Sequence, residues 1–187
     1  HCEKGESVIV VILKKLVKNA IAKTPDFTGG KELATIDGPW QVKFDAAWGG
    51  PAKPVEFTAL QDWTINADEG IKYYSGTAVY AKFFDAPSTQ TMGKKSALYL
   101  DLGLVNHIAR VLLNGKELGV VWTAPWRIAL PAALLKKQNN QLVIEVTNVW
   151  ANRLIGDEQQ PADCEGLHNQ YFYNIGHKLK KFREWFL

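Results

Sequence analysis

Aromatic rings, guanidinium groups and side-chain amides gather between residues 122 and 157. An aromatic ring stacks on the apolar C–H face of a sugar, while amides, carboxylates and guanidinium groups hydrogen-bond the sugar's hydroxyls. This combination predicts a surface that contacts carbohydrate without covalent chemistry. The candidate contacting residues are Trp122, Trp126, Arg127, Trp150, Asn152 and Arg153, with Asn148 and Asp157 as further polar groups nearby.

Each candidate also has a purely structural interpretation. Trp126 alternates with Ile128, as residues on a buried strand face do, and Trp150 would cap the end of a sheet structure. Arg153 and Asp157 would pair with each other, a contact that contributes little when exposed. The chain contains seven tryptophans in 187 residues, a number that calls for a reason beyond filling a core. At this stage both interpretations stay open.

Catalysis has weaker support. Cleavage of a glycosidic bond needs two carboxyl groups held across it, and one predicted loop is rich in acidic residues. The acidic residues of this loop are Asp157, Glu158, Asp163 and Glu165. A solvated loop and a calcium site explain the same residues, although their spacing is not that of an EF-hand. The sequence has no Gly-x-Ser-x-Gly and no His-Glu-x-x-His motif. We therefore assign no catalytic residue, keep calcium open as a cofactor, and leave the metal ligands unknown.

Charge and hydropathy argue against nucleic-acid binding and against a membrane-spanning segment. The formal net charge is only +3, which gives little support for nucleic-acid binding. The longest apolar run, residues 8–13, is far too short to span a bilayer. Hydrophobic residues make up 47% and charged residues 22%, as in ordinary globular proteins. Cys2 and Cys164 lie near opposite ends of the chain, so the sequence does not settle whether they form a disulfide or stay free thiols.

Short strands must position the candidate residues. Asn114-Gly115 between two apolar runs predicts a hairpin with a type I′ turn, because both residues tolerate a positive φ. The predicted strands span residues 7–13, 38–44, 77–84, 97–102, 108–113, 117–121, 126–130 and 141–148. Residues 14–36 and 45–54 read as loops, and residues 132–136 as a single helical turn. Many short strands with turn signals between them predict an all-β fold, a β-sandwich. Apolar residues at helical spacing near the C-terminus predict a short helix or an irregular tail.

Two motifs connect these strands to known proteins. Residues 113–119 read Leu-Asn-Gly-Lys-Glu-Leu-Gly, and residues 140–148 alternate Asn-x-Leu-x-Ile-x-Val-x-Asn. With them, residues 73–157 resemble the galactose-binding-like jelly-roll domain that accompanies many glycoside hydrolases. A closer resemblance is to the C-terminal region of α-L-rhamnosidase-like proteins of glycoside hydrolase family 106. The stretches that carry it are residues 73–80, 100–103 and 152–157, with residues 38–40, 48–51 and 61–63 towards the N-terminus and 5–8 as the end of a preceding domain.

The resemblance implies a fold and a domain order. It implies a galactose-binding-like jelly roll over residues 37–160, after a terminal strand and linker of a preceding domain in residues 1–36. Residues 161–187 form a C-terminal tail that the resemblance does not explain. The chain starts at His1 without an initiator methionine, and we expect it to be a piece of a longer protein.

The resemblance also implies a function. In such proteins the catalytic acids lie in a large upstream domain, so this chain is not itself expected to be an enzyme. The expected role is a non-catalytic carbohydrate-binding or accessory domain, with a mono- or oligosaccharide and the catalytic domain as partners. The alternative is a structural domain that buttresses the catalytic domain and binds no ligand. The implied location is periplasmic or extracellular.

Overall fold

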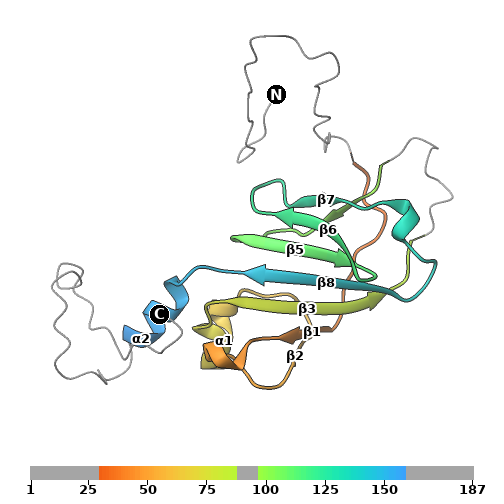
Figure 1. Ribbon diagram of the computed structural model, residues 1–187. Coiled ribbons are helices and arrows are strands. Elements are labelled where there is room, and N and C mark those ends of the chain that lie inside the picture. Colours follow the sequence, from red (N-terminus) through yellow and green to blue (C-terminus); the bar gives the residue numbers. More distant parts are fainter. Residues whose placement is uncertain (1–29, 88–96, 159–187) are drawn as a thin grey trace, which may run out of the picture. The chain divides into compact units, whose positions relative to one another are not determined.

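The computed structural model describes residues 30–87 and 97–158 (Figure 1). The strands in these ranges are β1 (Trp40–Lys43), β2 (Val55–Phe57), β3 (Thr77–Phe84), β4 (Tyr99–Asp101), β5 (Ile108–Leu113), β6 (Lys116–Val121), β7 (Arg127–Ala129) and β8 (Asn140–Thr147). The helices are α1 (Glu69–Lys72) and α2 (Ala151–Glu158), and the 3-10 turns are η1 (Ala46–Trp48), η2 (Trp63–Ile65) and η3 (Ala132–Leu134). None of the helices in this part of the chain is long and apolar enough to cross a bilayer.

The described part of the chain is mostly β, as predicted. Six strands form a sheet in the order β2-β1-β3-β8-β5-β6, and β4 pairs with β7 in a second sheet. The pairs β1–β2, β4–β7 and β5–β6 are antiparallel. Strand β3 has the predicted bounds, β8 begins and ends one residue before the predicted range, and the predicted helical turn is η3.

The described residues divide into two compact units. Unit 1 contains residues 30–37, 81–87 and 97–146, and unit 2 contains residues 38–80 and 147–158. The border between them crosses β3 and β8, so each unit is described by itself. The predicted domain limits at residues 36 and 160 stay predictions.

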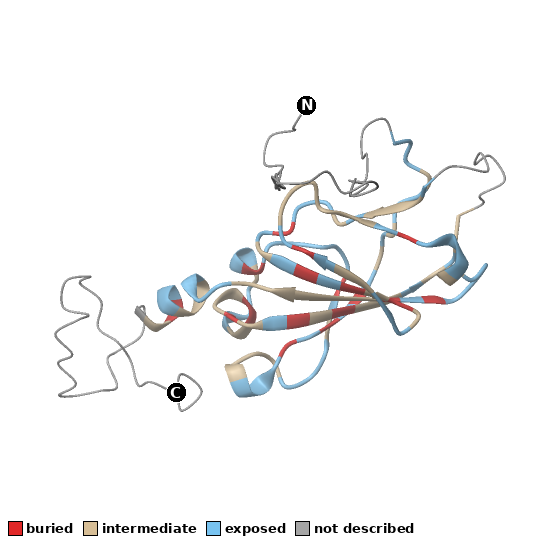
Figure 2. Ribbon diagram, turned by 45° about the horizontal axis from the view of Figure 1, so that its top comes forward, coloured by how far each residue is buried: buried red, intermediate tan, exposed pale blue. Residues whose placement is uncertain are grey.

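Unit 2 has an aromatic core. Trp40, Val42 and Phe44 alternate with polar residues along β1 and its end, and all three side chains are buried. Figure 2 shows in red the buried positions along the ribbon. The Phe44 ring meets the Tyr74 ring edge to face, with centroids 5.0 Å apart, and meets the Trp63 ring in the same way at 5.5 Å. Such edge-to-face pairs add stability beyond the burial of their area. Two of the seven tryptophans, Trp40 and Trp63, therefore serve this core.

The predicted hairpin of unit 1 is confirmed. Asn114 and Gly115 have φ angles of 51° and 79°, as a two-residue type I′ turn requires. Val111 pairs with Gly119 and Leu112 pairs with Glu117, so Leu118 is an extra residue in β6 and forms a bulge. Gly119 has a φ of 140°, which a residue with a Cβ adopts only with strain. The turn accounts for Asn114 and Gly115, and the bulge accounts for Leu118 and Gly119, in the motif at residues 113–119.

A buried asparagine anchors the start of β8 in unit 1. Asn140 is fully buried, and its Oδ1 accepts hydrogen bonds from the Asn114 side chain at 3.0 Å and the Lys136 N–H at 2.8 Å. Its Nδ2 donates to the carbonyls of Lys136 and Phe84. The Asn114 side chain also accepts from the Gln141 N–H. A buried amide with every polar atom bonded ties the hairpin to β8.

Some secondary-structure predictions were wrong, and others concern residues that the structure does not describe. Asp157 and Glu158 were expected to lie in an acidic loop and instead form the end of α2. Strand β2, the turn η2 and helix α1 were not predicted. The predicted strand at residues 7–13, the tail at residues 161–187, both cysteines, and Asp163 and Glu165 of the acidic loop lie outside the described residues.

Candidate functional site

Short polar side chains shape one wall of the candidate site in unit 2. The Asp62 carboxylate accepts a hydrogen bond from the Thr64 N–H at 2.9 Å and caps η2. The Asp68 carboxylate accepts from the Gly70 N–H at 2.8 Å and caps α1, while Asn66 accepts from the Asp68 N–H. Asp and Asn favour such caps because their side chains satisfy amide groups that the first helical turn leaves free. Residues 62–72 are therefore held as two successive short turns.

Asn148 fixes the loop that leads into β3. Its Nδ2 donates to the Tyr74 carbonyl at 2.9 Å, and its Oδ1 accepts from the Gly76 N–H at 2.8 Å. Its own N–H donates to the Gly76 carbonyl at 3.2 Å. Both ends of this side-chain amide are bound to backbone, so Asn148 positions the loop. We therefore assign Asn148 a structural role and no longer count it among the candidate sugar contacts.

Ser75 caps α2 from another part of the chain. The Ser75 hydroxyl accepts a hydrogen bond from the Arg153 N–H at 3.0 Å, and Ser75 is buried. A helix leaves the N–H groups of its first turn without partners inside the helix. Trp150, which precedes α2, has no side-chain acceptor that could bond them. Ser75 therefore provides the N-terminal cap that Trp150 cannot provide.

Gly156 brings α2 close to Tyr73. A Cβ built on Gly156 would lie 2.6 Å from the Cβ and Cγ of Tyr73, which no real side chain tolerates. Gly156 is buried accordingly. The stretches 73–76 and 148–157, which carry much of the sequence resemblance, thus interlock through Tyr73, Ser75, Gly76, Asn148 and Gly156.

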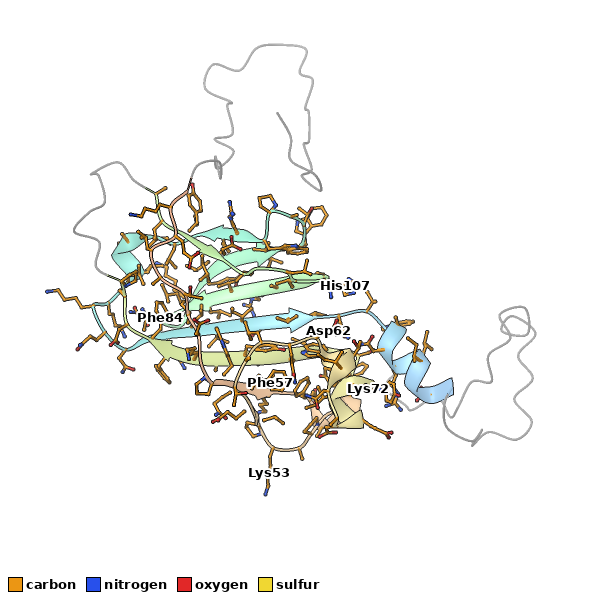
Figure 3. The ribbon with its side chains drawn as sticks, turned by 180° about the vertical axis from the view of Figure 1, so that it is seen from behind. Lys53, Phe57, Asp62, Lys72, Phe84 and His107 are labelled. Carbon is orange, nitrogen blue, oxygen red and sulfur yellow. The ribbon has the colours of Figure 1, made fainter. Side chains whose placement is uncertain are left out.

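A partly open pocket lies in unit 2 between the residues around α1 and helix α2. Its volume is about 190 Å³ and its lining residues are Thr64, Lys72, Tyr73, Asn152 and Ile155. The Lys72 ammonium lies 5.2 Å from the centre of the Tyr73 ring, within cation–π range. Figure 3 labels Lys72 and Asp62 in this part of unit 2. The pocket thus offers a hydroxyl, an ammonium group, an amide and an aromatic ring side by side.

The carboxylates in reach of the candidate residues are paired with arginines. Arg153 Nε lies 3.0 Å from an Asp157 oxygen one helical turn away, as the structural interpretation of this pair predicted. In unit 1, Arg127 Nε donates to Asp101 at 2.7 Å. Partial burial would raise the pKa of Asp101, but the hydrogen bonds from Arg127 and the Gly103 N–H, with the charge of Arg127, outweigh it and lower the pKa.

The six predicted contacting residues fall into both units. Trp122, Trp126 and Arg127 belong to unit 1, whereas Trp150, Asn152 and Arg153 belong to unit 2. Trp122 and Trp150 are each 63% exposed, and Trp126 is half-buried. Only Asn152 of the six lines the pocket. A joint carbohydrate-contacting set therefore stays a prediction.

Sequence reasoning missed four of the five residues that line the pocket: Thr64, Lys72, Tyr73 and Ile155. Thr64, Lys72 and Tyr73 lie on or beside turns too short to show periodicity. Their signal in the sequence is the spacing of Asp62 and Asp68, each followed two residues later by the amide that it caps. Among the described residues, no three His, Cys, Asp or Glu side chains are grouped so that they could hold a metal ion.

Comparisons with known proteins place this geometry in context. No protein-family model matches the chain. A protein of Formosa agariphila named "Putative beta-glucuronidase" is 41% identical over 152 residues, which is 81% of this chain and 12% of that protein. The structure of a rhamnosidase from Novosphingobium is 41% identical, with a TM-score of 0.65 over 75% of this chain and 13% of that one. A Ruminococcus gnavus beta-glucuronidase structure aligns with a TM-score of 0.49 and 24% identity over 62% of this chain and 21% of that one.

Proposed function

We propose that this chain is a non-catalytic module of a larger glycoside hydrolase that resembles rhamnosidases and glucuronidases. The observation that carries the proposal is the 41% identity over most of this chain to a region that makes up only 12% or 13% of two proteins with such names. The chain spans about an eighth of each of them, so the rest of such a protein lies outside the matched region.

The contacts of two carboxylates beside the predicted contacting residues support a non-catalytic role. A glycosidase needs a carboxylic acid whose pKa is raised, so that it can protonate the leaving oxygen. Asp101 has a lowered pKa beside Arg127, and Asp157 is bound to Arg153. Asp101 therefore favours the charged form, and the ion pair of Asp157 with Arg153 lies within helix α2.

Within this function, we propose that the module contacts carbohydrate at the pocket of unit 2. Asn152 and Thr64 supply hydrogen-bonding groups there, and the Tyr73 ring supplies an apolar face. The exposed Trp150, just before α2, would add a stacking surface, and the Arg153–Asp157 ion pair would stabilise α2. A volume of about 190 Å³ is below the roughly 300–1,000 Å³ of sites that enclose larger ligands. One sugar ring at the surface suits it better than a buried oligosaccharide.

Titration calorimetry with the whole chain tests this site. Rhamnose, glucuronate and oligosaccharides that contain them are the probes. Asn152→Ala and Trp150→Ala should each weaken binding by about tenfold, the loss of roughly one hydrogen bond or stacking contact to the sugar. Trp122→Ala is the matched control, because Trp122 has the same exposed fraction in the other unit.

The outcomes separate the hypotheses. Binding that survives both unit 2 variants and is lost in Trp122→Ala would move the carbohydrate site to unit 1, with Trp126 and Arg127. The absence of binding to any probe would favour the second candidate, a module that only supports the catalytic domain. Hydrolysis of aryl rhamnosides or glucuronides by the chain alone would contradict the non-catalytic role itself.

Three further parts of the proposal come from the sequence resemblance. We propose that the complete module is a galactose-binding-like jelly roll, that it works in the periplasm or outside the cell, and that calcium is a candidate cofactor. Calorimetry with and without calcium tests the last of these.

A further inference from the structure

The turn of the β5–β6 hairpin contains a peptide group that is chemically reactive. In an Asn-Gly sequence the backbone nitrogen of the glycine attacks the asparagine side chain, and the glycine has no Cβ that would hinder its approach. Gly115 is exposed, and a Cβ built on it would have no neighbouring atom within 4 Å. Water therefore reaches this peptide group, and the conformation of Asn114 decides whether the reaction proceeds.

The reaction would turn Asn114 into an acidic residue. The Gly115 nitrogen forms a bond to Asn114 Cγ, the bond from Cγ to Nδ2 breaks, and the Gly115 amide proton leaves in ammonia. Water then opens the resulting imide ring at either of its carbonyl carbons. Opening at Cγ gives aspartate, and opening at the main-chain carbonyl gives isoaspartate, which lengthens the backbone of the turn.

The backbone conformation of Asn114 opposes the closure of this ring. Asn114 has a φ of 51°, in the left-handed region, where ψ is about +47°. The imide ring contains the Cα–C bond of Asn114 and brings Cβ into line with the Gly115 nitrogen, which requires a strongly negative ψ. The reaction therefore needs a rotation that opens the two-residue turn at the end of the hairpin.

Hydrogen bonds to the start of β8 and to the chain before it hold the Asn114 side chain as well. Nδ2 donates to the Leu134 carbonyl at 2.8 Å and to Asn140 Oδ1 at 3.0 Å, and Oδ1 accepts from the Gln141 N–H at 3.0 Å. The Asn114 N–H donates to the Gln141 carbonyl at 2.8 Å. Both polar atoms of the side chain are thus bonded, and Cγ cannot turn towards Gly115 until these bonds open.

We propose that Asn114 is a deamidation site that the fold keeps closed and that separation of the hairpin from β8 exposes. A carboxylate oxygen in place of Nδ2 would face the Leu134 carbonyl and Asn140 Oδ1, and none of these oxygens has a hydrogen to donate. Deamidation therefore weakens the junction between the hairpin and β8 permanently, and the modified fraction records how long the junction has been open. This inference is independent of any ligand of the pocket in unit 2.

Peptide mapping of the whole chain by mass spectrometry tests the proposal. The chain is incubated at mildly alkaline pH, folded in buffer or unfolded in guanidinium chloride, and the deamidated fraction at Asn114 is followed with time. The rate in the folded chain should be lower by about tenfold or more, the effect of roughly two hydrogen bonds that ring closure has to break. Equal rates in the two states would overturn the proposal.

Asn140→Ala tests the role of the side-chain hydrogen bonds. The variant removes one acceptor of Asn114 Nδ2 and leaves the Asn-Gly sequence intact. The rate in the unfolded chain should be unchanged, and the rate in the folded chain should rise by about threefold or more, the effect of roughly one hydrogen bond. Tyr80→Phe is the matched control, because it removes a buried hydrogen bond to Trp63 in unit 2.

The two variants are compared at equal free energies of unfolding, which added denaturant adjusts. A faster reaction in Asn140→Ala than in Tyr80→Phe would support opening of the junction with β8 as the controlling step. Equal rates would show that only global unfolding exposes Asn114 and would refute that step. If Asn140→Ala does not fold, the comparison of the folded and unfolded natural chain decides on its own.

Discussion

At the scale of single residues, the core of unit 2 contains a phenol that is costly to ionise. The Trp63 indole N–H donates to the Tyr80 hydroxyl, and both side chains are buried. Burial raises the pKa of Tyr80 from 10.0 to about 12, although the Trp63 hydrogen bond partly opposes this. Burial also raises the pKa of Tyr74. Tyr80 therefore stays neutral in the folded chain at pH values where it ionises in the unfolded chain.

The pKa of Tyr80 predicts a loss of stability at alkaline pH. Above pH 10.0 the unfolded chain releases the proton that the folded chain retains until about pH 12. The unfolded state then binds fewer protons, so the free energy of unfolding decreases as the pH rises, by up to ~3 kcal/mol for this residue. Urea unfolding at neutral pH and between these two pKa values measures the decrease.

Tyr80→Phe provides the control for this prediction. The variant should lose about 1–3 kcal/mol at neutral pH, because the Trp63 N–H is left without its partner. Its alkaline decrease should be smaller than that of the natural chain. An equal decrease in both proteins would mean that other groups, such as Tyr74, cause it.

The residue scale also shows what the sequence could and could not reveal. The Asn-Gly turn was predictable because few residues accept positive φ at both positions. The role of Asn148 could not be predicted, because its partners Tyr74 and Gly76 lie more than seventy residues away in the chain. An asparagine available to a sugar and one that binds backbone look the same in a sequence.

At the scale of elements, α2 depends on contacts that its own residues do not provide. An eight-residue helix is marginal in water, and α2 takes its cap from Ser75 and its close packing from Tyr73. That is why the sequence did not predict α2, and Asp157 and Glu158 were assigned to a loop. Strand β3, by contrast, was predictable in full, because it is rich in aromatic and β-branched residues and is bounded by Gly76 and Asp85.

Gly156→Ala tests the packing of α2. By intrinsic propensity alone, alanine would stabilise a helix by roughly 1 kcal/mol over glycine. Here the added Cβ would overlap the Tyr73 side chain at 2.6 Å, so we expect a net loss of about 1–3 kcal/mol. Urea unfolding measures the change, and faster hydrogen exchange at the Leu154 amide would locate it in α2.

Gly30→Ala is the matched control for this substitution. A Cβ at Gly30 has no atom within 4 Å, and the variant should unfold like the natural chain. A Gly156→Ala variant that is more stable than the natural chain would show that α2 does not pack on Tyr73 as described.

At the scale of the whole molecule, the described chain presents two surfaces of different chemistry, one in each unit. The pocket of unit 2 combines polar groups with a ring, whereas Ile108, Val120 and Trp122 of unit 1 expose aliphatic and aromatic side chains. The sequence predicted tryptophans with a role outside the core but treated them as one set. It could not separate them, because the division into units crosses β3 and β8 and follows no boundary in composition.

Val120→Glu tests the second candidate function, a module that supports the catalytic domain, at an exposed apolar residue of unit 1. The substitution should leave the unfolding of the isolated chain within about 0.5 kcal/mol, because Val120 is exposed there. In the full-length polypeptide, a charge buried at a domain contact should lower the thermal midpoint of the module or split its transition from that of the rest. Calorimetric scanning of both forms measures this.

Val149→Glu is the control, because Val149 is 49% exposed and Val120 is 50% exposed. If both variants shift the full-length transition equally, the effect comes from added charge in general and the contact is not located at Val120.

The cap that Ser75 gives to α2 restricts how such modules can be recombined. Consider a chimaera that takes residues 147–158 from a relative and keeps residues 73–76 of this chain. Its helix α2 would then pack on a loop that fits the helix of another protein. Both stretches have to be exchanged together, although seventy residues of sequence separate them. Homologous modules should therefore accept substitutions at these two stretches as matched sets and reject them singly.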